Sequence, residues 1–228
     1  MQLDVFIEGE TIDLCVPTLE FAQKSDWYKW FNDIHTTRYL EHGVFPNTPE
    51  KQIEFFQNAQ KNRLLLIIVN KNSKAIGSTS LMNINYKTRS AALGIVVGNL
   101  AEKTQIRTLE SIARITEHGF LKLGLQRIYA GQHINHIPYS HRMSLLGYRI
   151  EGIERGGFVK GIETADVIKI ACTYEDYQRI VEHRGVYWDS QESMLTRIKT
   201  LQKQESMHKK LQSFFQESQQ YYDRIFSL

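Results

Sequence analysis

Cysteine is scarce in this sequence, and its scarcity argues against two common ways of holding a chain together. The 228 residues include two cysteines, Cys15 and Cys172, and both lie in apolar, strand-like surroundings. A buried free thiol in such a setting behaves as a small hydrophobic side chain. Neither cysteine has a histidine or a second cysteine at the spacing of metal ligands, so we expect neither a disulfide framework nor a metal site.

An excess of charge of one sign is also missing. The chain carries 28 basic and 25 acidic side chains, which give a net charge of +3, and no basic stripe is visible. Proteins that bind nucleic acid through its phosphates rely on such a stripe. Nucleic acid is therefore not expected as a partner.

Long apolar runs are absent as well. Runs such as RLLLIIVN at residues 63–70 are far shorter than a bilayer span. The N-terminal MQLDVFIEGE lacks the basic start and apolar stretch of a secretory signal. A hydrophobic share of 42% and a charged share of 23% are ordinary for a globular protein. We expect a folded, cytoplasmic protein without a membrane span.

Proline and glycine are missing from residue 187 onward, where glutamine, lysine and glutamate are frequent. Apolar residues recur there at steps of four and three, which predicts helical stripes with phase breaks between them. The stripes are Met194, Ile198 and Leu201, then Met207, Leu211 and Phe214, then Tyr221 and Ile225. Three roles remain open for this segment: a helix folded back on its own domain, a dimer-forming helix, or a tail that contacts substrate. We expect a domain at residues 1–180 and a helical extension at 181–228.

The order of predicted elements in the first domain indicates a mixed α/β or α+β fold. A short hairpin precedes Pro17, and a helix with an irregularity near Ser25 follows it. A second helix should begin at Pro49 behind the cap Thr48, with Gln52 at the capping-box position. Three strand-like runs then predict an antiparallel meander. A helix over residues 105–123, a strand, a short helix ending at Gly147 and further strands complete the domain.

The stretch GIVVGNLAEKTQIRTLESIARITEHGF, residues 94–120, runs from an apolar strand into an amphipathic helix. The turn between them has the length of a loop that cradles phosphate groups. No glycine occurs between Gly98 and Gly119, although glycine is the residue that lets a backbone approach phosphate most closely. It is open at this stage whether such a turn can hold an anionic ligand.

The ordered set of motifs resembles the GNAT superfamily of acyl-CoA-dependent N-acetyltransferases, and specifically the branch of ribosomal-protein alanine and amino-sugar acetyltransferases. The resemblance covers about residues 5–175. It is carried by RSAALGIVVG, TLESIARITEHGFLKLGLQRIYA, NHIPYSHRMSLLGYRIEG and GFVKGIETADVIKIA, in that order. It implies a GNAT-like, mostly antiparallel central sheet with flanking helices, to which the C-terminal helical extension is added.

The resemblance also implies acetyl-CoA as the acyl donor. In the family, the central strand splays from its neighbour, so backbone groups near Ile95 and Val97 would bond the pantetheine like an added strand. The amides at the start of the next helix would hold the diphosphate. Counted back from Glu110, which matches the family's helix glutamate, the usual glycine positions carry Thr104, Ile106 and Thr108, and a β-branched Ile106 disfavours positive φ. The implied cofactor-binding residues are Ile95, Val97, Lys103, Thr104, Gln105, Ile106, Arg107, Thr108 and Asn135.

Acetyl transfer to an amine needs a base for the ammonium proton and an acid for the leaving thiolate. The family often places a glutamate on the central strand, but this sequence has Ala92 there. His42 is our first candidate for the base, with Glu41 next. A loop histidine that orders the GVFPNTP segment by hydrogen bonding is the alternative, and it is favoured over any single catalytic assignment. His35, His133 and His136 are weaker candidates, and a water chain is the remaining option for the base.

Two residues of the next helix are candidates for the acid. Tyr139 and Ser140 lie where the family places a serine or tyrosine close to the thioester sulfur, and a phenol can protonate a thiolate. Simple packing of Tyr139 beside the cofactor is the alternative. Asp166 matches a frequent family aspartate, which we expect to be structural.

The implied function is transfer of an acetyl group from acetyl-CoA to a primary amine. The segment YLEHGVFPNTPEKQIEFF resembles the amino-sugar members of the branch more than the protein-modifying ones. This resemblance implies a nucleotide-linked amino sugar of a bacterial surface-glycan or flagellin-modification pathway as the acceptor. A protein N-terminus is the enzymatic alternative. A non-catalytic GNAT-like scaffold is the alternative from another class, and the missing glycines are its main support. A homodimer through the C-terminal helix is possible in either case.

Overall fold

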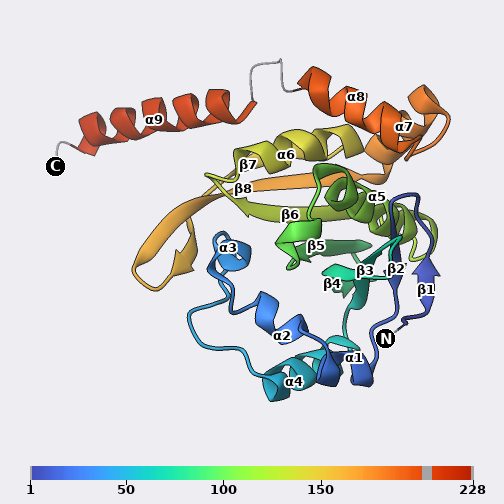
Figure 1. The fold of residues 1–228 in the computed structure, drawn as a ribbon. Coiled ribbons are helices and arrows are strands. Elements are labelled where there is room, and N and C mark those ends of the chain that lie inside the picture. The colour runs from blue at the N-terminus through green and yellow to red at the C-terminus, as the bar shows by residue number, and fades with distance from the viewer. Residues whose placement is uncertain (1, 202–206, 227–228) are drawn as a thin grey trace.

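The computed structural model describes residues 2–201 and 207–226, and in this part of the chain eight strands form one mixed sheet (Figure 1). The strand order is β1-β2-β3-β4-β5-β6-β8-β7, and every neighbouring pair is antiparallel except β5 and β6. This confirms the expected mixed fold with a mostly antiparallel sheet. The strands are β1 (Val5–Ile7), β2 (Ile12–Cys15), β3 (Leu64–Asn70), β4 (Ala75–Asn85), β5 (Ser90–Val97), β6 (Arg127–His133), β7 (Arg149–Lys160) and β8 (Glu163–Thr173).

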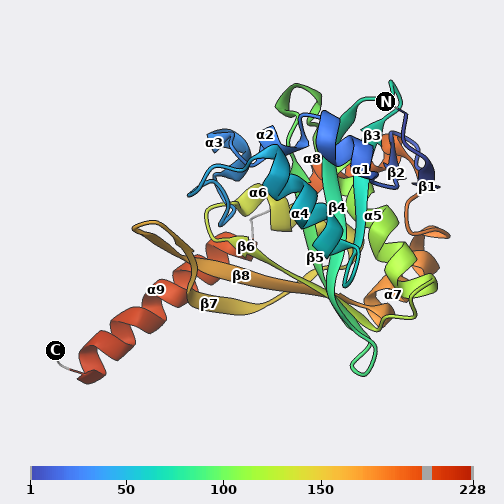
Figure 2. The same cartoon turned by 90° about the horizontal axis from the view of Figure 1, so that it is seen from below.

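Helices cover both faces of the sheet (Figures 1 and 2). One face carries α1 (Leu19–Lys24), α2 (Trp27–Trp30) and α4 (Pro49–Ala59), with α3 (Ile34–Thr37) beside them. The other face carries α5 (Gln105–Leu121) and α6 (Ile137–Met143). Alternate side chains of the strands therefore enter two separate apolar cores, because successive residues of a strand point to opposite faces.

Capping residues define where the helices on the first face begin. The Thr48 side chain accepts a hydrogen bond from the amide of Lys51, and Pro49 occupies the first position of α4, as the sequence predicts. Thr18 caps α1 in the same way. The helix expected from Thr18 onward is interrupted at Ser25, whose extended backbone separates α1 from α2.

The two central strands separate after three residues. β5 pairs in parallel with β6 only from Ser90 to Ala92, although β5 extends to Val97 and β6 to His133. Helix α5 connects them, and it starts at the open end of the split. The divergence leaves one edge of β5 without a strand partner around Ile95, and this edge leads into the start of α5.

A long hairpin of β7 and β8 closes the sheet. Its pairing is irregular between Glu154 and Phe158, where Gly156 adopts a positive φ of 61°. The amide of Gly156 donates a hydrogen bond to Asp166 on β8, at 2.8 Å. Asp166 thus stabilises an irregular strand, a structural part of the kind expected for it.

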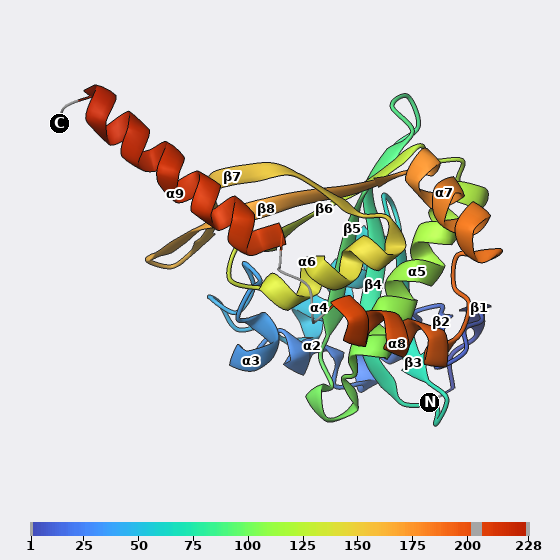
Figure 3. The same cartoon turned by 90° about the horizontal axis from the view of Figure 1, so that it is seen from above.

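The C-terminal segment divides into helices with different surroundings. The expected boundary at residue 180 falls inside α7 (Tyr174–Arg184). Helix α8 (Gln191–Leu201) lies against α5 and α6 and buries Met194 and Ile198, whereas α9 (Met207–Phe226) extends away from the body beside the β7–β8 hairpin (Figure 3). Residues 202–206 and 227–228 of the predicted extension lie outside the described residues. None of the helices that the structure describes is long and apolar enough to cross a membrane.

Candidate active site

The loop between β5 and α5 is shaped by one glycine and one cap. A side-chain carbon at Gly98 would come within 1.9 Å of the Trp30 ring, so only glycine fits where the loop leaves the strand. The loop then forms a short helical turn, Leu100–Glu102, and reaches Thr104. The Thr104 hydroxyl accepts a hydrogen bond from the amide of Arg107 at 3.2 Å and so begins α5.

The glycine-free turn is built without unusual backbone. No residue between Gly98 and Gly119 has a positive φ, and all of these residues belong to the described part of the chain. Ile106 is helical and points into the core with Leu109, so its branched side chain does not crowd the loop. The turn needs no further glycine because the helix begins directly after the cap.

Two amides at this helix start have no acceptor among the residues described, those of Gln105 and Ile106. The amide of Arg107 is taken by Thr104, and both the amide and the hydroxyl of Thr108 donate to the Thr104 carbonyl. Free amides at a helix N-terminus attract anions, because the helix dipole adds to their partial positive charge. The first turn of α5 therefore presents an anion-binding end.

Not all of the cationic side chains beside this turn are free to face an anion. The Arg107 guanidinium donates to the carboxylate and the carbonyl of Glu102, and Lys74 pairs with the same carboxylate. By contrast, Lys103 and Arg142 form no ion pair with any residue that the structure describes. Burial and the nearby charge of Arg142 lower the pKa of Lys103, and burial lowers the pKa of Arg142. An anion placed between these two cations would relieve their repulsion.

Arg142 is a candidate site residue that the sequence pattern did not indicate. It lies near the end of α6, and the motif around it indicates a short helix but not the side of the helix that faces the loop. Its electrostatic effect on Lys103 places its charge near the β5–α5 loop.

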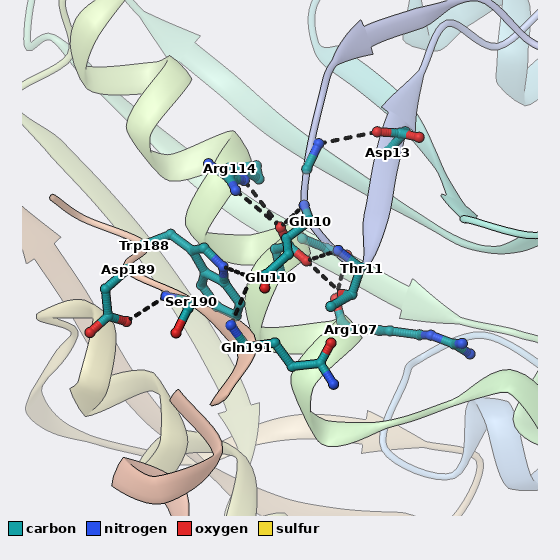
Figure 4. A network of polar contacts seen from close by, with 12 residues as sticks. Glu10, Thr11, Asp13, Arg107, Glu110, Arg114, Trp188, Asp189, Ser190 and Gln191 are labelled. Carbon is teal, nitrogen blue, oxygen red and sulfur yellow. Dashed lines mark hydrogen bonds and ion pairs between the residues drawn. The ribbon is translucent and has the colours of Figure 1, made fainter. Parts of the chain in front are cut away.

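Glu110, in the first half of α5, links this helix to the β1–β2 turn (Figure 4). Its side chain is fully buried and accepts hydrogen bonds from the amides of Glu10 and Thr11 and from the Thr11 hydroxyl. Arg114, one turn further along α5, completes the set with an ion pair of 3.1 Å. With this many donors, the free-energy cost of burying the carboxylate is offset by its hydrogen bonds and ion pair. The β1–β2 turn and α5 are therefore held together at this point.

A cavity of about 450 Å³ lies on the opposite face of the sheet, under α4. Its floor is made by Ser78 and Ser80 of β4 and Gly94 of β5, which are small residues on one face of adjacent strands. Larger side chains at these positions would fill the space, as Leu81 and Leu93 do on the other face. Small residues thus create a hollow directly beside the free edge of β5.

The candidate bases line this cavity. His42 and Glu41 both belong to its wall, in the loop that precedes α4. The His42 ring packs against Phe31 at 5.1 Å between centroids. Although the His42 side chain is exposed, partial desolvation in the cavity wall lowers its pKa. Glu41 opposes this shift, and Lys160 adds to it. The neutral, proton-accepting form of His42 is therefore favoured.

The candidate acids lie on α6, and neither belongs to the described cavity wall. Burial raises the pKa of Tyr139, and its ring stacks on His136 at 5.3 Å between centroids. The Ser140 hydroxyl accepts a hydrogen bond from Gln132 at 2.8 Å. The structure therefore separates the two sets, with His42 and Glu41 at the cavity and Tyr139 and Ser140 on the far side of the split strands.

Asn135 and the weaker histidine candidates lie at the end of β6. The amide of Asn135 donates to Nδ1 of His133 at 3.1 Å. Tyr39 packs against both His133 and His136 at 4.9 Å between centroids, so these imidazoles belong to an aromatic stack. His35 lies apart from them in α3. In the described residues, no group of three histidine, cysteine, aspartate or glutamate side chains is placed to hold a metal ion.

Comparison of the whole chain with solved structures finds the same fold in known acetyltransferases. A spermidine N-acetyltransferase from Vibrio cholerae, in complex with CoA and spermine, matches with a TM-score of 0.67 and 17% identity, over 75% of this chain and 99% of that one. A GCN5-related N-acetyltransferase from Brucella melitensis matches with a TM-score of 0.65 and 17% identity, over 77% and 81%. The microcin C7 self-immunity acetyltransferase MccE, in complex with acetyl-CoA and AMP, matches with a TM-score of 0.62 and 18% identity, over 72% and 93%.

Sequence comparison assigns the family. No curated protein sequence matches the chain. The model of the acetyltransferase (GNAT) domain matches residues 15–149, which is more than half of the chain and spans β2 to the end of the α6 region. With the split central strands and the helix start between them, this match leads to one conclusion: the chain belongs to the GNAT family of acetyltransferases.

Proposed function

We propose that this protein transfers the acetyl group of acetyl-CoA to a primary amine by direct attack of the amine. The observation that carries the proposal is the split between β5 and β6. The split ends at the free amides of α5 on one side and adjoins the cavity on the other side. A donor and an acceptor could therefore approach the same strand from opposite faces.

The chain offers fitting groups along the whole donor path. The unpaired edge of β5 around Ile95 and Val97 suits the amides of the pantetheine arm. Asn135, just beyond the end of β6, is a further candidate for this contact. The amides of Gln105 and Ile106, flanked by Lys103 and Arg142, suit the diphosphate. Thr104, Arg107 and Thr108 support this part of the site by shaping the turn. When bound, acetyl-CoA supplies an activated acyl group, and no metal is needed for that chemistry.

The proposed proton transfers use the two separated sets of side chains. His42 accepts the proton from the acceptor ammonium, because its lowered pKa keeps it neutral near pH 7. Glu41, beside it in the cavity wall, is the reserve base. Burial raises the pKa of Tyr139, so its phenol stays protonated, although the same shift makes it a weaker proton donor than a free tyrosine. Its proton is the one proposed for the leaving thiolate. Ser140 is the alternative donor on the same helix.

For the acceptor we propose a nucleotide-linked amino sugar, which would place the chain in the amino-sugar part of the ribosomal-protein alanine and amino-sugar branch. The loop and α4 segment that suggested this acceptor provides much of the cavity wall. A protein N-terminus is the other acceptor of this branch. The solved spermidine N-acetyltransferase adds a polyamine to the acceptors that deserve a test.

A thiol-release assay with acetyl-CoA tests the function directly. The acceptor panel contains nucleotide-linked amino sugars, free amino sugars, peptides with a free N-terminus, and spermidine. Both cysteines of the protein are buried, and burial raises their pKa values to about 11 for Cys15 and about 12 for Cys172, so they add little background. Turnover restricted to peptides would reject the amino-sugar acceptor.

Calorimetric titration with CoA separates the enzyme from a scaffold that has only the GNAT fold. We expect saturable binding at micromolar CoA, because the amides of Gln105 and Ile106 and the two cations remain available. An absence of heat at high micromolar CoA would support the scaffold.

A further inference from the structure

An arginine that forms no ion pair with any residue described in the structure lies at the α4 end of the cavity. Arg63 precedes β3, lines the cavity and is half-buried. Its guanidinium lies over the Phe55 ring at 5.2 Å, and its Nε atom is buried without a hydrogen-bond acceptor in the part of the chain that the structure describes. Burial lowers the pKa of Arg63, which is the direction expected for a cation that lacks a compensating carboxylate.

A second orphaned donor lies in the same wall. Gln52 of α4 is 1% exposed, and its Oε1 atom accepts a hydrogen bond from Asn47 at 2.9 Å. This contact orients the amide group, and its buried Nε2 atom is left without an acceptor among the described residues. Buried donors almost always have a partner in folded proteins, so two orphans in one cavity wall indicate a ligand with acceptor atoms.

The charges around the cavity point to the sign of that ligand. Arg63 and Lys51 are positively charged and lie toward α4. Glu41 is the acidic residue of the described cavity wall, and it lies in the loop beside His42. A polycation would meet repulsion at the α4 end, whereas an anion would compensate the arginine.

We infer that the acceptor carries an anionic oxygen group, a carboxylate or a phosphate, which Arg63 and Gln52 bind while the acceptor amine faces β5. Arginine binds both groups through paired, charge-assisted hydrogen bonds. The inference rests on the proposed function, because it assigns the acceptor class of that same site. It also disfavours a polyamine such as the spermine of the solved neighbour.

The strand register indicates how far apart the amine and the anionic group of such an acceptor must lie. Leu65 of β3 pairs with Ser80 of β4, and Ser80 pairs with Gly94 of β5. Two strand spacings, roughly 10 Å, therefore separate the Arg63 end of the cavity from the strand where the amine must react. The amine and the anionic group of the acceptor should be several bonds apart.

Four amines of matched length test the inference: aminohexyl phosphate, aminohexanoate, aminohexanol and spermidine. We expect the phosphate or the carboxylate to be acetylated with at least tenfold higher kcat/KM than the alcohol, and the better of the two identifies the anion. In Arg63→Gln, the KM for the anionic amines should rise by about 10- to 100-fold, the range expected for charge-assisted hydrogen bonds, with the alcohol unchanged.

Lys61→Gln is the matched control, because Lys61 is exposed, lies two residues earlier and is absent from the described cavity wall. It removes the same charge and should leave all four substrates unchanged. An equal rise in the KM for the anionic amines in both variants would show a general charge effect and overturn the inference. Arg63→Gln with unchanged preference, or turnover restricted to spermidine, would also overturn it.

Binding separates the inference from the proposed function. Calorimetric titration of aminohexyl phosphate and aminohexanoate into the protein with CoA present reports the anion site without any turnover. Binding that Arg63→Gln abolishes, together with no acetylation of any amine, would uphold the anion site and reject the transferase. No binding of either anion, with acetylation of the alcohol, would reject the anion site and uphold the transferase.

Discussion

The imidazole of His42 combines a position in the cavity wall with a lowered pKa. Its ordinary value is 6.5, and burial, the largest cause, shifts it downward. A group with a pKa below 6.5 is mostly neutral at pH 7 and can accept a proton there. The proposed role therefore depends on a single side chain whose charge state changes in an accessible pH range.

His42→Gln should lower kcat by about 10²-fold, the usual contribution of one general base. In the wild type, kcat should fall with decreasing pH as His42 becomes protonated below pH 6.5, and this lower limb should disappear in the variant. A pH profile of steady-state rates at saturating acetyl-CoA measures both effects. His183→Gln, which removes an exposed imidazole on α7, is the control. A normal rate in His42→Gln would transfer the role to Glu41 or to water.

At the scale of secondary-structure elements, the start of α5 forms the proposed donor site. The cap Thr104 opens the helix, Glu110 ties its second turn to the β1–β2 turn, and Arg142 approaches from α6. Three elements from different parts of the chain thus fix one helix end. Removal of the Glu110 carboxylate or of the Arg142 charge should affect the free energy of unfolding and the affinity for CoA to different degrees.

Glu110→Gln should lower the free energy of unfolding by about 2 kcal/mol, because it weakens buried charge-assisted hydrogen bonds and leaves Arg114 without its carboxylate. Urea denaturation of the two proteins measures the difference. Glu175→Gln is the comparison, since its exposed ion pair with Arg179 on α7 should contribute less than about 0.5 kcal/mol. Equal stability of Glu110→Gln and the wild type would show that the network does not hold α5 in place.

Arg142→Gln should weaken CoA binding by about tenfold and reduce its dependence on salt, because one cation facing the diphosphate is removed. Calorimetric titration with CoA at two salt concentrations provides the measurement. Lys122→Gln at the opposite end of α5 removes an exposed charge far from the proposed site and should have no effect. An unchanged affinity in Arg142→Gln would place the diphosphate away from α6.

At the scale of the whole molecule, the first part of the C-terminal extension belongs to the fold. Met194 and Ile198 of α8 join the same core as α5, and Glu10 accepts hydrogen bonds from Trp188 and from the amide of Gln191. These contacts favour the first of the three expected roles for α8, a helix folded back on its own domain. Helix α9 contacts α6 and the β7–β8 hairpin, where its Phe215 ring lies beneath Arg155.

Met194→Ala should lower the free energy of unfolding by roughly 3 kcal/mol, because it leaves a cavity in the core shared by α5 and α8. Phe214→Ala in α9 should change it by less than about 0.5 kcal/mol, because this side chain is 67% exposed. Thermal and urea unfolding of both variants test the contrast. A small effect of Met194→Ala would show that α8 folds as an appendage.

The sequence predicted much of the architecture because its signals are local. The cap Thr48 followed by Pro49, the three strand runs of the meander and the helix that follows Thr104 depend on residues close together in the chain. The order of these elements was enough to indicate the GNAT family and its mostly antiparallel sheet. The exact break at Ser25 and the extent of the β5–β6 split were less accessible, because packing against other elements sets them.

The sequence by itself determined which elements form and in what order, since caps, periodicity and turn residues act over a few positions. Tertiary structure alone decided which side chains meet. It placed Arg142 beside Lys103 and separated His42 from Tyr139. It also put the Nε atom of Arg63 and the Nε2 atom of Gln52 in one cavity wall, where neither has an acceptor among the described residues. The physical reason is that burial, charge pairing and a cavity floor of small residues depend on contacts between distant segments, which no local pattern records.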